Sequence, residues 1–125
     1  MFKRGGYNMG LPQIVSRNTT QQNIGQTIEG RVTSQSTGLY TVPAGKTTKV
    51  LGVTGIVDGV GSDSKVGIAI KRGSNVRPIG PFVIVDEESS YTGELILQAG
   101  DIITTLGNAG GTNAGIDMTA TIIEL

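Results

Sequence analysis

The amino-acid sequence predicts an all-β protein: a two-sheet antiparallel β-sandwich, jelly-roll-like, preceded by an extended N-terminal arm. The first observation is composition, because 20 Gly and 4 Pro in 125 residues exceed the average share of these turn formers by about half. The second is that apolar residues, 37% of the chain, recur in short segments separated by turns. The third is that no segment keeps a helical period for even two turns, which excludes a helical bundle.

The chain divides at about residue 35, where the composition changes. Residues 1–35 are rich in Asn, Gln, Thr and Gly, and their isolated apolar side chains keep neither a strand period nor a helix period for long. Residues 1–28 carry three bases and no acid, whereas residues 29–125 carry seven bases and ten acids. We therefore predict an extended arm over residues 1–35 and a β-sandwich domain over residues 36–125.

The arm holds the residues that we expect to bind a partner. Its apolar side chains are too many for a solvated linker and too irregular for a local core. Aromatic, Met and Arg side chains are enriched where proteins bind one another. The alternative is a frayed terminus that binds nothing. The predicted partner-binding residues are Phe2, Lys3, Arg4, Tyr7, Met9, Leu11 and Arg17.

The sandwich opens with a strand, a turn and a long strand. Residues 39–42 form the first strand, and residues 43–46 form the turn, in which Pro restricts φ and Gly supplies a positive φ. Residues 47–57 form the second strand, with Leu51, Val53 and Val57 predicted on one face. Gly52 and Gly55 in this strand indicate a bulge or a close approach of another backbone.

The middle of the chain continues the alternation of strands and turns. Residues 65–71 alternate apolar with small or polar residues, which is typical of a half-buried strand. Residues 76–79 contain a proline and so can lie only at a sheet edge. The apolar residues 82–85 predict a short buried strand, which the acidic turn at residues 86–90 would end.

Three more strands complete the predicted sandwich. They span residues 91–97, 102–106 and 116–125, so that the total is seven or eight strands, the number typical of a sandwich or jelly roll. A turn at residues 98–101 joins the first two. The Gly-rich residues 107–115 form either a flexible loop or a place where two subunits approach closely.

Composition also excludes several functions. The chain has no Cys and no His, which removes disulfides, thiolate metal sites and the commonest general base. Ten bases balance ten acids, so we expect no nucleic-acid partner and no attraction to a membrane surface. No apolar run is long enough to span a bilayer, and the N-terminus lacks the apolar core of a signal peptide. We expect a protein that is soluble, not exported by the usual route and not an enzyme.

Two motifs resemble ligand sites. Gly45, Lys46 and Thr47 match the end of a phosphate-binding loop, but Tyr40 stands where that loop requires Gly, and a strand follows in place of a helix. The motif is therefore interpreted as a hairpin turn, and no cofactor or small-molecule substrate is expected. Residues 86–88 form an acidic cluster that could hold a cation, although their spacing favours a solvated turn.

One family resemblance is visible in the turn motifs. The string LYTVPAGKT at residues 39–47, then VLGV at 50–53, ELILQAGDII at 94–103 and a last strand at 116–125 resemble small β-sandwich virion proteins of tailed bacteriophages. The resemblance covers residues 39–125, and its turn motifs are shared by capsid decoration (cement) proteins and by fibre proteins attached to heads or tails. It implies a non-enzymatic particle component, commonly a trimer on the capsid, with no catalytic residues to carry over.

From these observations we predict a capsid decoration protein. It would bind the outer surface of the major capsid protein lattice as a homo-oligomer, expected to be a trimer, and stabilise the head of the virion after synthesis in the host cytoplasm. A tail, neck or head-fibre attachment protein is the alternative. A carbohydrate-binding module is a further one, although the exposed aromatic platform of such modules is missing, and a hydrolase is the least expected.

Overall fold

The computed structural model describes residues 25–58, 65–107 and 115–125, and these form eight β-strands and no helix. Accordingly, none of this part of the chain forms a helix able to cross a membrane. The strands are β1 (Gln26–Val32), β2 (Tyr40–Thr41), β3 (Thr47–Val57), β4 (Val66–Arg72), β5 (Asn75–Pro78), β6 (Glu88–Gln98), β7 (Ile102–Gly107) and β8 (Ile116–Glu124).

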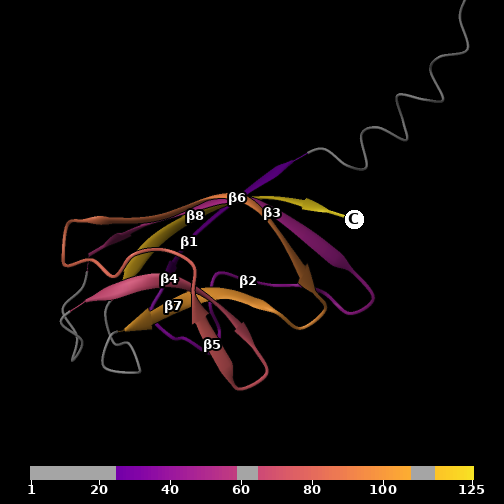
Figure 1. The fold of residues 1–125 in the computed structure, drawn as a ribbon, viewed down its shortest axis with the longest axis horizontal. Coiled ribbons are helices and arrows are strands. Elements are labelled where there is room, and N and C mark those ends of the chain that lie inside the picture. Colours follow the sequence, from indigo (N-terminus) through magenta and orange to yellow (C-terminus); the bar gives the residue numbers. More distant parts are fainter. Residues whose placement is uncertain (1–24, 59–64, 108–114) are drawn as a thin grey trace, which may run out of the picture.

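The eight strands form two antiparallel sheets that face each other (Figure 1). One sheet has the order β1-β8-β3-β6, and the other has the order β2-β7-β4-β5. The hydrogen-bonded pairs are therefore nested in the sequence: β4 with β5, β3 with β6, β2 with β7 and β1 with β8. The predicted all-β class, a two-sheet antiparallel sandwich, is confirmed.

The predicted boundary between arm and sandwich requires a correction. Strand β1 pairs with β8 from Gln26↔Ile122 to Val32↔Ile116, so residues 26–32 of the predicted arm belong to the sandwich. The physical reason is that β1 is an edge strand, held mainly by backbone hydrogen bonds, and its side chains are largely exposed. Its polar composition therefore gave no apolar alternation from which the strand could be predicted. Residues 1–24 lie outside the described residues.

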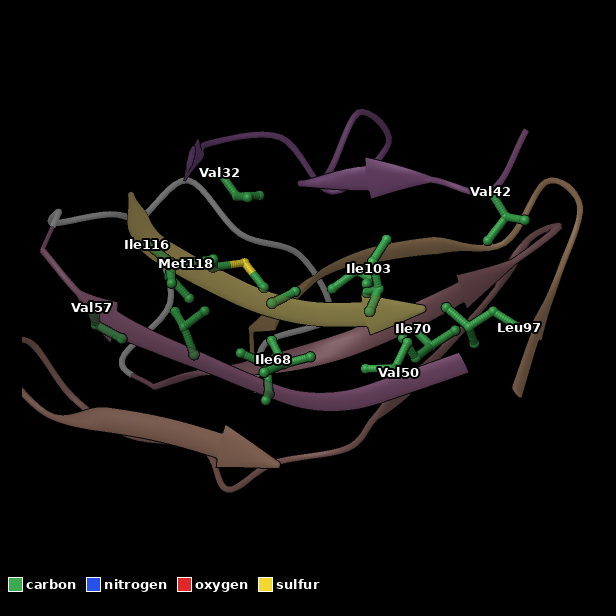
Figure 2. Close-up of a cluster of buried hydrophobic side chains, with 14 residues drawn as sticks. Val32, Val42, Val50, Val57, Ile68, Ile70, Leu97, Ile103, Ile116 and Met118 are labelled. Atoms are coloured by element: carbon green, nitrogen blue, oxygen red, sulfur yellow. The ribbon is translucent and has the colours of Figure 1, made fainter. Parts of the chain in front are cut away.

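The core lies between the two sheets and is built from aliphatic side chains (Figure 2). Strand β8 confirms the predicted alternation most clearly, because Ile116, Met118, Ala120 and Ile122 are all buried. Across the sandwich, Ile68 and Ile103 are completely buried. No Phe or Trp belongs to this cluster, so the distance between the sheets is set by branched aliphatic residues.

A bulge in β3 changes which side chains face the core. The register against both β6 and β8 shifts between Val50 and Gly52, as the glycine pattern predicted. Val50 faces the core before the bulge, and Val53 and Val57 face it after the bulge. The prediction that Leu51 shares their face was wrong, because Leu51 is the extra residue of the bulge and is only partly buried.

Gly55 marks a close approach within the core. A Cβ atom added at this position would lie 2.7 Å from Ile116 Cγ2 and 3.2 Å from Ile68 Cγ2. Gly55 thus leaves space for one side chain from the neighbouring strand β8 and one from β4 in the opposite sheet. Of the two alternatives that the glycines indicated, the bulge is present, whereas the atoms close to Gly55 belong to side chains and not to another backbone.

The apolar residues 82–85 do not form the predicted buried strand. Only Val83 pairs, in a single bridge with Val66, and a turn follows at once, in which the Glu87 N–H donates to the Ile84 carbonyl. Ile84 and Val85 are 48% and 41% exposed. Pro81 has no N–H to donate, and the turn follows Val83 directly, so the segment is too short to form a strand. The hydrophobic pattern alone therefore predicted burial for residues that are exposed.

Two further predictions concern the edges and the turns. Strand β5, which contains Pro78, lies at a sheet edge as predicted. The turn at residues 43–46 is also confirmed, with Gly45 at φ 76° and a Lys46 N–H bond to the Pro43 carbonyl. It is not a hairpin, however, because β2 and β3 belong to different sheets.

Gly55→Ala tests the packing of Ile116 and Ile68 against Gly55. The added methyl group must displace Ile116 or Ile68, so we expect the free energy of unfolding to fall by about 1 to 3 kcal/mol in urea denaturation. Gly25→Ala is the matched control, because its nearest atom would be 3.7 Å away. Equal stability of G55A and G25A would contradict the assignment.

Candidate interaction surfaces

The predicted partner-binding residues lie outside the part of the chain that the structure describes. Phe2, Lys3, Arg4, Tyr7, Met9, Leu11 and Arg17 all precede residue 25, and their role stays a prediction. Most of the Gly-rich stretch, residues 108–114, also lies outside it. The described residues nevertheless present three surfaces whose chemistry can be examined.

The first surface is organised by a clamp between Arg72 and Asp101. Arg72 Nε donates to Asp101 Oδ1 at 2.8 Å, and Arg72 Nη2 donates to Oδ2 at 2.5 Å. The same Oδ2 accepts the N–H of Gln98 at 2.8 Å, which closes the β6–β7 turn, where Gly100 has φ 90°. The carboxylate is almost fully buried, and the clamp therefore joins that turn to the end of β4.

The clamp keeps Asp101 ionised. The Arg72 guanidinium lowers the pKa of the Asp101 carboxyl below its ordinary value, the Gln98 N–H lowers it further, and burial opposes both effects. Hydrogen bonds to an ionised carboxylate favour its charged form. The AGD motif in the sequence is thus explained by a structural role, in which Gly permits the turn and Asp secures it.

A groove opens beside this clamp, between β5 and β6, the edge strands of the two sheets. Its volume is about 310 Å³. Apolar side chains line it together with the polar groups of Arg72, Arg77 and Asn75. Arg77 forms no ion pair with any described residue. The apolar lining residues are Ile70, Ile79, Leu95, Ile96 and Leu97. Such a groove suits an apolar segment that also carries negative charge.

The second surface is a small apolar and acidic tip at residues 84–88, between β5 and β6. Exposed Ile84 and Val85 stand beside Asp86, Glu87 and Glu88. Backbone bonds fix the tip, because the Asp86 N–H donates to the Val57 carbonyl and the Val57 N–H donates to the Glu87 carbonyl. Asp86 adopts φ 72°, and Glu87 Oε1 accepts the Ile84 N–H at 3.1 Å.

The third surface is the outer face of the sheet that contains β1. There Arg31 Nη1 contacts Asp58 Oδ2 at 2.7 Å and Asp117 Oδ1 at 3.2 Å. All three side chains are about half exposed, and such pairs contribute little to stability. Ile56, also exposed, lies with Arg31 and Asp117 along a shallow depression of about 530 Å³. This face is largely polar and suited to contact with another protein.

No described surface combines the groups that catalysis by a bound metal would use. Residues 25–58, 65–107 and 115–125 contain no group of three His, Cys, Asp or Glu residues placed to hold a metal ion. Two buried hydroxyls bond to the backbone, since Ser89 donates to the Pro81 carbonyl and Thr104 donates to the Gln35 carbonyl, and the buried Thr48 hydroxyl lies 3.5 Å from the Tyr40 hydroxyl. Their contacts are structural.

Comparison with known proteins indicates the fold. No family model matches the chain, and no curated protein matches it. Among solved structures, the chain resembles one from the acidic stable capsid structure of Helicobacter pylori bacteriophage KHP30, with a TM-score of 0.54 and 8% sequence identity. The match covers 82% of this chain and 93% of that chain. The two therefore share a fold across nearly the whole of the bacteriophage chain.

Sequence reasoning missed the groove and misplaced the tip. The groove joins side chains from β4, β5 and β6, and only the pairing of strands brings them together. For the tip, one signal was present in the sequence: three consecutive acids follow Ile84 and Val85 directly, and a buried strand seldom runs straight into such a charge cluster.

Asp101→Asn tests the clamp. The variant loses the charge that Arg72 contacts, and we expect a loss of about 2 kcal/mol in the free energy of unfolding. Because the folded pKa of Asp101 lies below its unfolded value, the stabilisation is present above pH 4 or so and disappears as the pH falls through the folded pKa. Urea denaturation between pH 7 and pH 2 measures both effects. A pH dependence unchanged in D101N would refute this role.

Proposed function

We propose that this chain is a structural virion protein of a tailed bacteriophage, and specifically a capsid decoration protein. The observation that carries the proposal is the shared fold with a chain of a bacteriophage capsid structure, over 82% of the present chain. The turn motifs at residues 39–47 and 94–103 support the same class independently, through their resemblance to phage virion proteins.

The surfaces of the described residues are compatible with assembly. The outer face of the β1 sheet is largely polar, and β1 and β6, the two edges of that sheet, are strands that can accept a further partner. The core contains no large aromatic side chain, so burial of further surface against other subunits would add stability to a small domain.

In this proposal the sandwich forms a homo-oligomer, expected to be a trimer, and the arm binds the major capsid protein. The three bases of the arm contrast with the excess of acids in the rest of the chain. Ordering an extended segment costs about 1 to 2 kcal/mol per residue in backbone entropy. A partner that buries Phe2, Tyr7, Met9 and Leu11 would offset this cost.

Deletion of residues 1–24 tests the arm. Because β1 begins at Gln26, the truncated chain keeps every described strand, and we expect it to fold with unchanged stability. Its binding to capsids that lack this protein is expected to fall at least tenfold in a co-sedimentation assay. A full-length chain with Lys3, Arg4 and Arg17 changed to Ser is the matched control for charge alone, and we expect an intermediate loss.

A truncated protein that still saturates the capsids would show that the arm does not anchor the chain. Cryo-electron microscopy of the virion distinguishes the alternatives, because density on the head surface supports decoration, whereas density only at the neck or tail refutes it. Binding to a glycan array without binding to any particle would instead favour a carbohydrate-binding module.

A further inference from the structure

The tip at residues 84–88 and the groove between β5 and β6 are complementary in chemistry. The tip presents two exposed apolar side chains, Ile84 and Val85, followed by three acids. The groove presents an apolar lining with Arg72 and Arg77 beside it. The apolar side chains of the tip therefore match the apolar lining of the groove, and the negative charge of the tip is opposite to the positive charge of the groove.

One chain cannot bring its own tip into its own groove. The tip precedes β6 at Glu88, whereas the groove uses Leu95, Ile96 and Leu97 near the other end of the same strand. Eight residues of extended strand separate Glu88 from Ile96, a distance of about 26 Å. The hydrogen bonds of the tip to Val57 hold it in place, so it cannot fold back across that distance.

We propose that the tip of one copy of this chain occupies the β5/β6 groove of a second copy. The inference rests on the homo-oligomer of the proposed function and identifies its interface. Ile84 and Val85 contact the apolar lining, and the acids face Arg77, which has no ion pair among the described residues. The contact is head-to-tail, and its repetition gives a closed ring, as a trimer requires, when the rotation between copies closes, and an open filament when it does not.

The other candidate occupants fit less well. Residues 1–24 carry three bases and no acid, so Arg77, whose charge no described carboxylate neutralises, would repel them. The preformed tip also needs little ordering on binding, because backbone hydrogen bonds and Glu87 Oε1 already fix its conformation. Charge and preorganisation both favour the second copy.

Engineered cysteines test this contact directly, because the natural chain has none. Val85→Cys on the tip and Asn75→Cys at the groove are made in separate proteins. We expect mild oxidation to cross-link a mixture of the two variants, whereas either variant alone stays free of cross-links. Thr27→Cys, at an exposed position of β1 on the opposite edge of the sheet from β6, is the control and should not cross-link with N75C.

Charge reversal at the groove measures the electrostatic part. We expect Arg77→Glu to raise the dissociation constant of the oligomer about tenfold in analytical ultracentrifugation, because attraction becomes repulsion, while Arg77→Lys stays close to wild type. Circular dichroism and urea denaturation establish that each variant is folded.

The proposal is overturned if the wild-type protein is monomeric at micromolar concentration, if an oligomeric mixture gives no cross-link between V85C and N75C, or if V85C cross-links with itself. These outcomes differ from failure of the proposed function. A monomer that still decorates capsids refutes only this interface, whereas a cross-linked ring that binds no part of the virion refutes only the role in decoration.

Discussion

The packing of Ile116 and Ile68 against Gly55 is the constraint on which the rest of this structure depends. Aliphatic side chains and Met118 fill the core, and a position without a Cβ receives Ile116 from the same sheet and Ile68 from the opposite sheet. The bulge between Val50 and Gly52 shifts the alternation of β3 by one residue. As a result, Val50 faces the core before the bulge and Val53 faces it after the bulge. The core between the sheets is small and supplies limited stability. The clamp between Arg72 and the buried Asp101 adds stability where the end of β4 meets the β6–β7 turn.

The sequence predicted the elements that depend on local patterns. The bounds of β3, the alternation of β8, the edge position of the proline strand and the bulge are all local properties, and each was confirmed. Strand β1 was missed because only Val32 and Ile28 of its side chains reach the core and the strand is held mainly by backbone pairing with β8. The exposure of Ile84 and Val85 was missed because a hydrophobic pattern does not specify what lies opposite it. The groove could not be predicted, since it exists only after β5 and β6 become edges of two different sheets.

Edges and their protection connect the fold with the proposed assembly. A sandwich leaves four edge strands, here β1, β6, β2 and β5, and unpaired edges invite contact with other chains. Strand β2 is only two residues long, and β5 carries a proline, so these two edges discourage uncontrolled pairing. An unpaired edge strand can pair with many other strands. Contact through the charged groove would instead restrict association to a partner that carries the apolar and acidic tip.

The nested pairing of the strands has a consequence for how the chain is made. The innermost pair, β4 with β5, can form as soon as both strands have left the ribosome, but β1 must wait for β8, which follows all the other described strands in the sequence. During that interval β1 has no partner, and an apolar strand in that position would aggregate. Its exposed Gln26, Glu29 and Arg31 keep it compatible with water until β8 arrives. The polar residues of β1, which gave no strand signal in the sequence, are therefore what a strand needs when its partner follows much later in the chain.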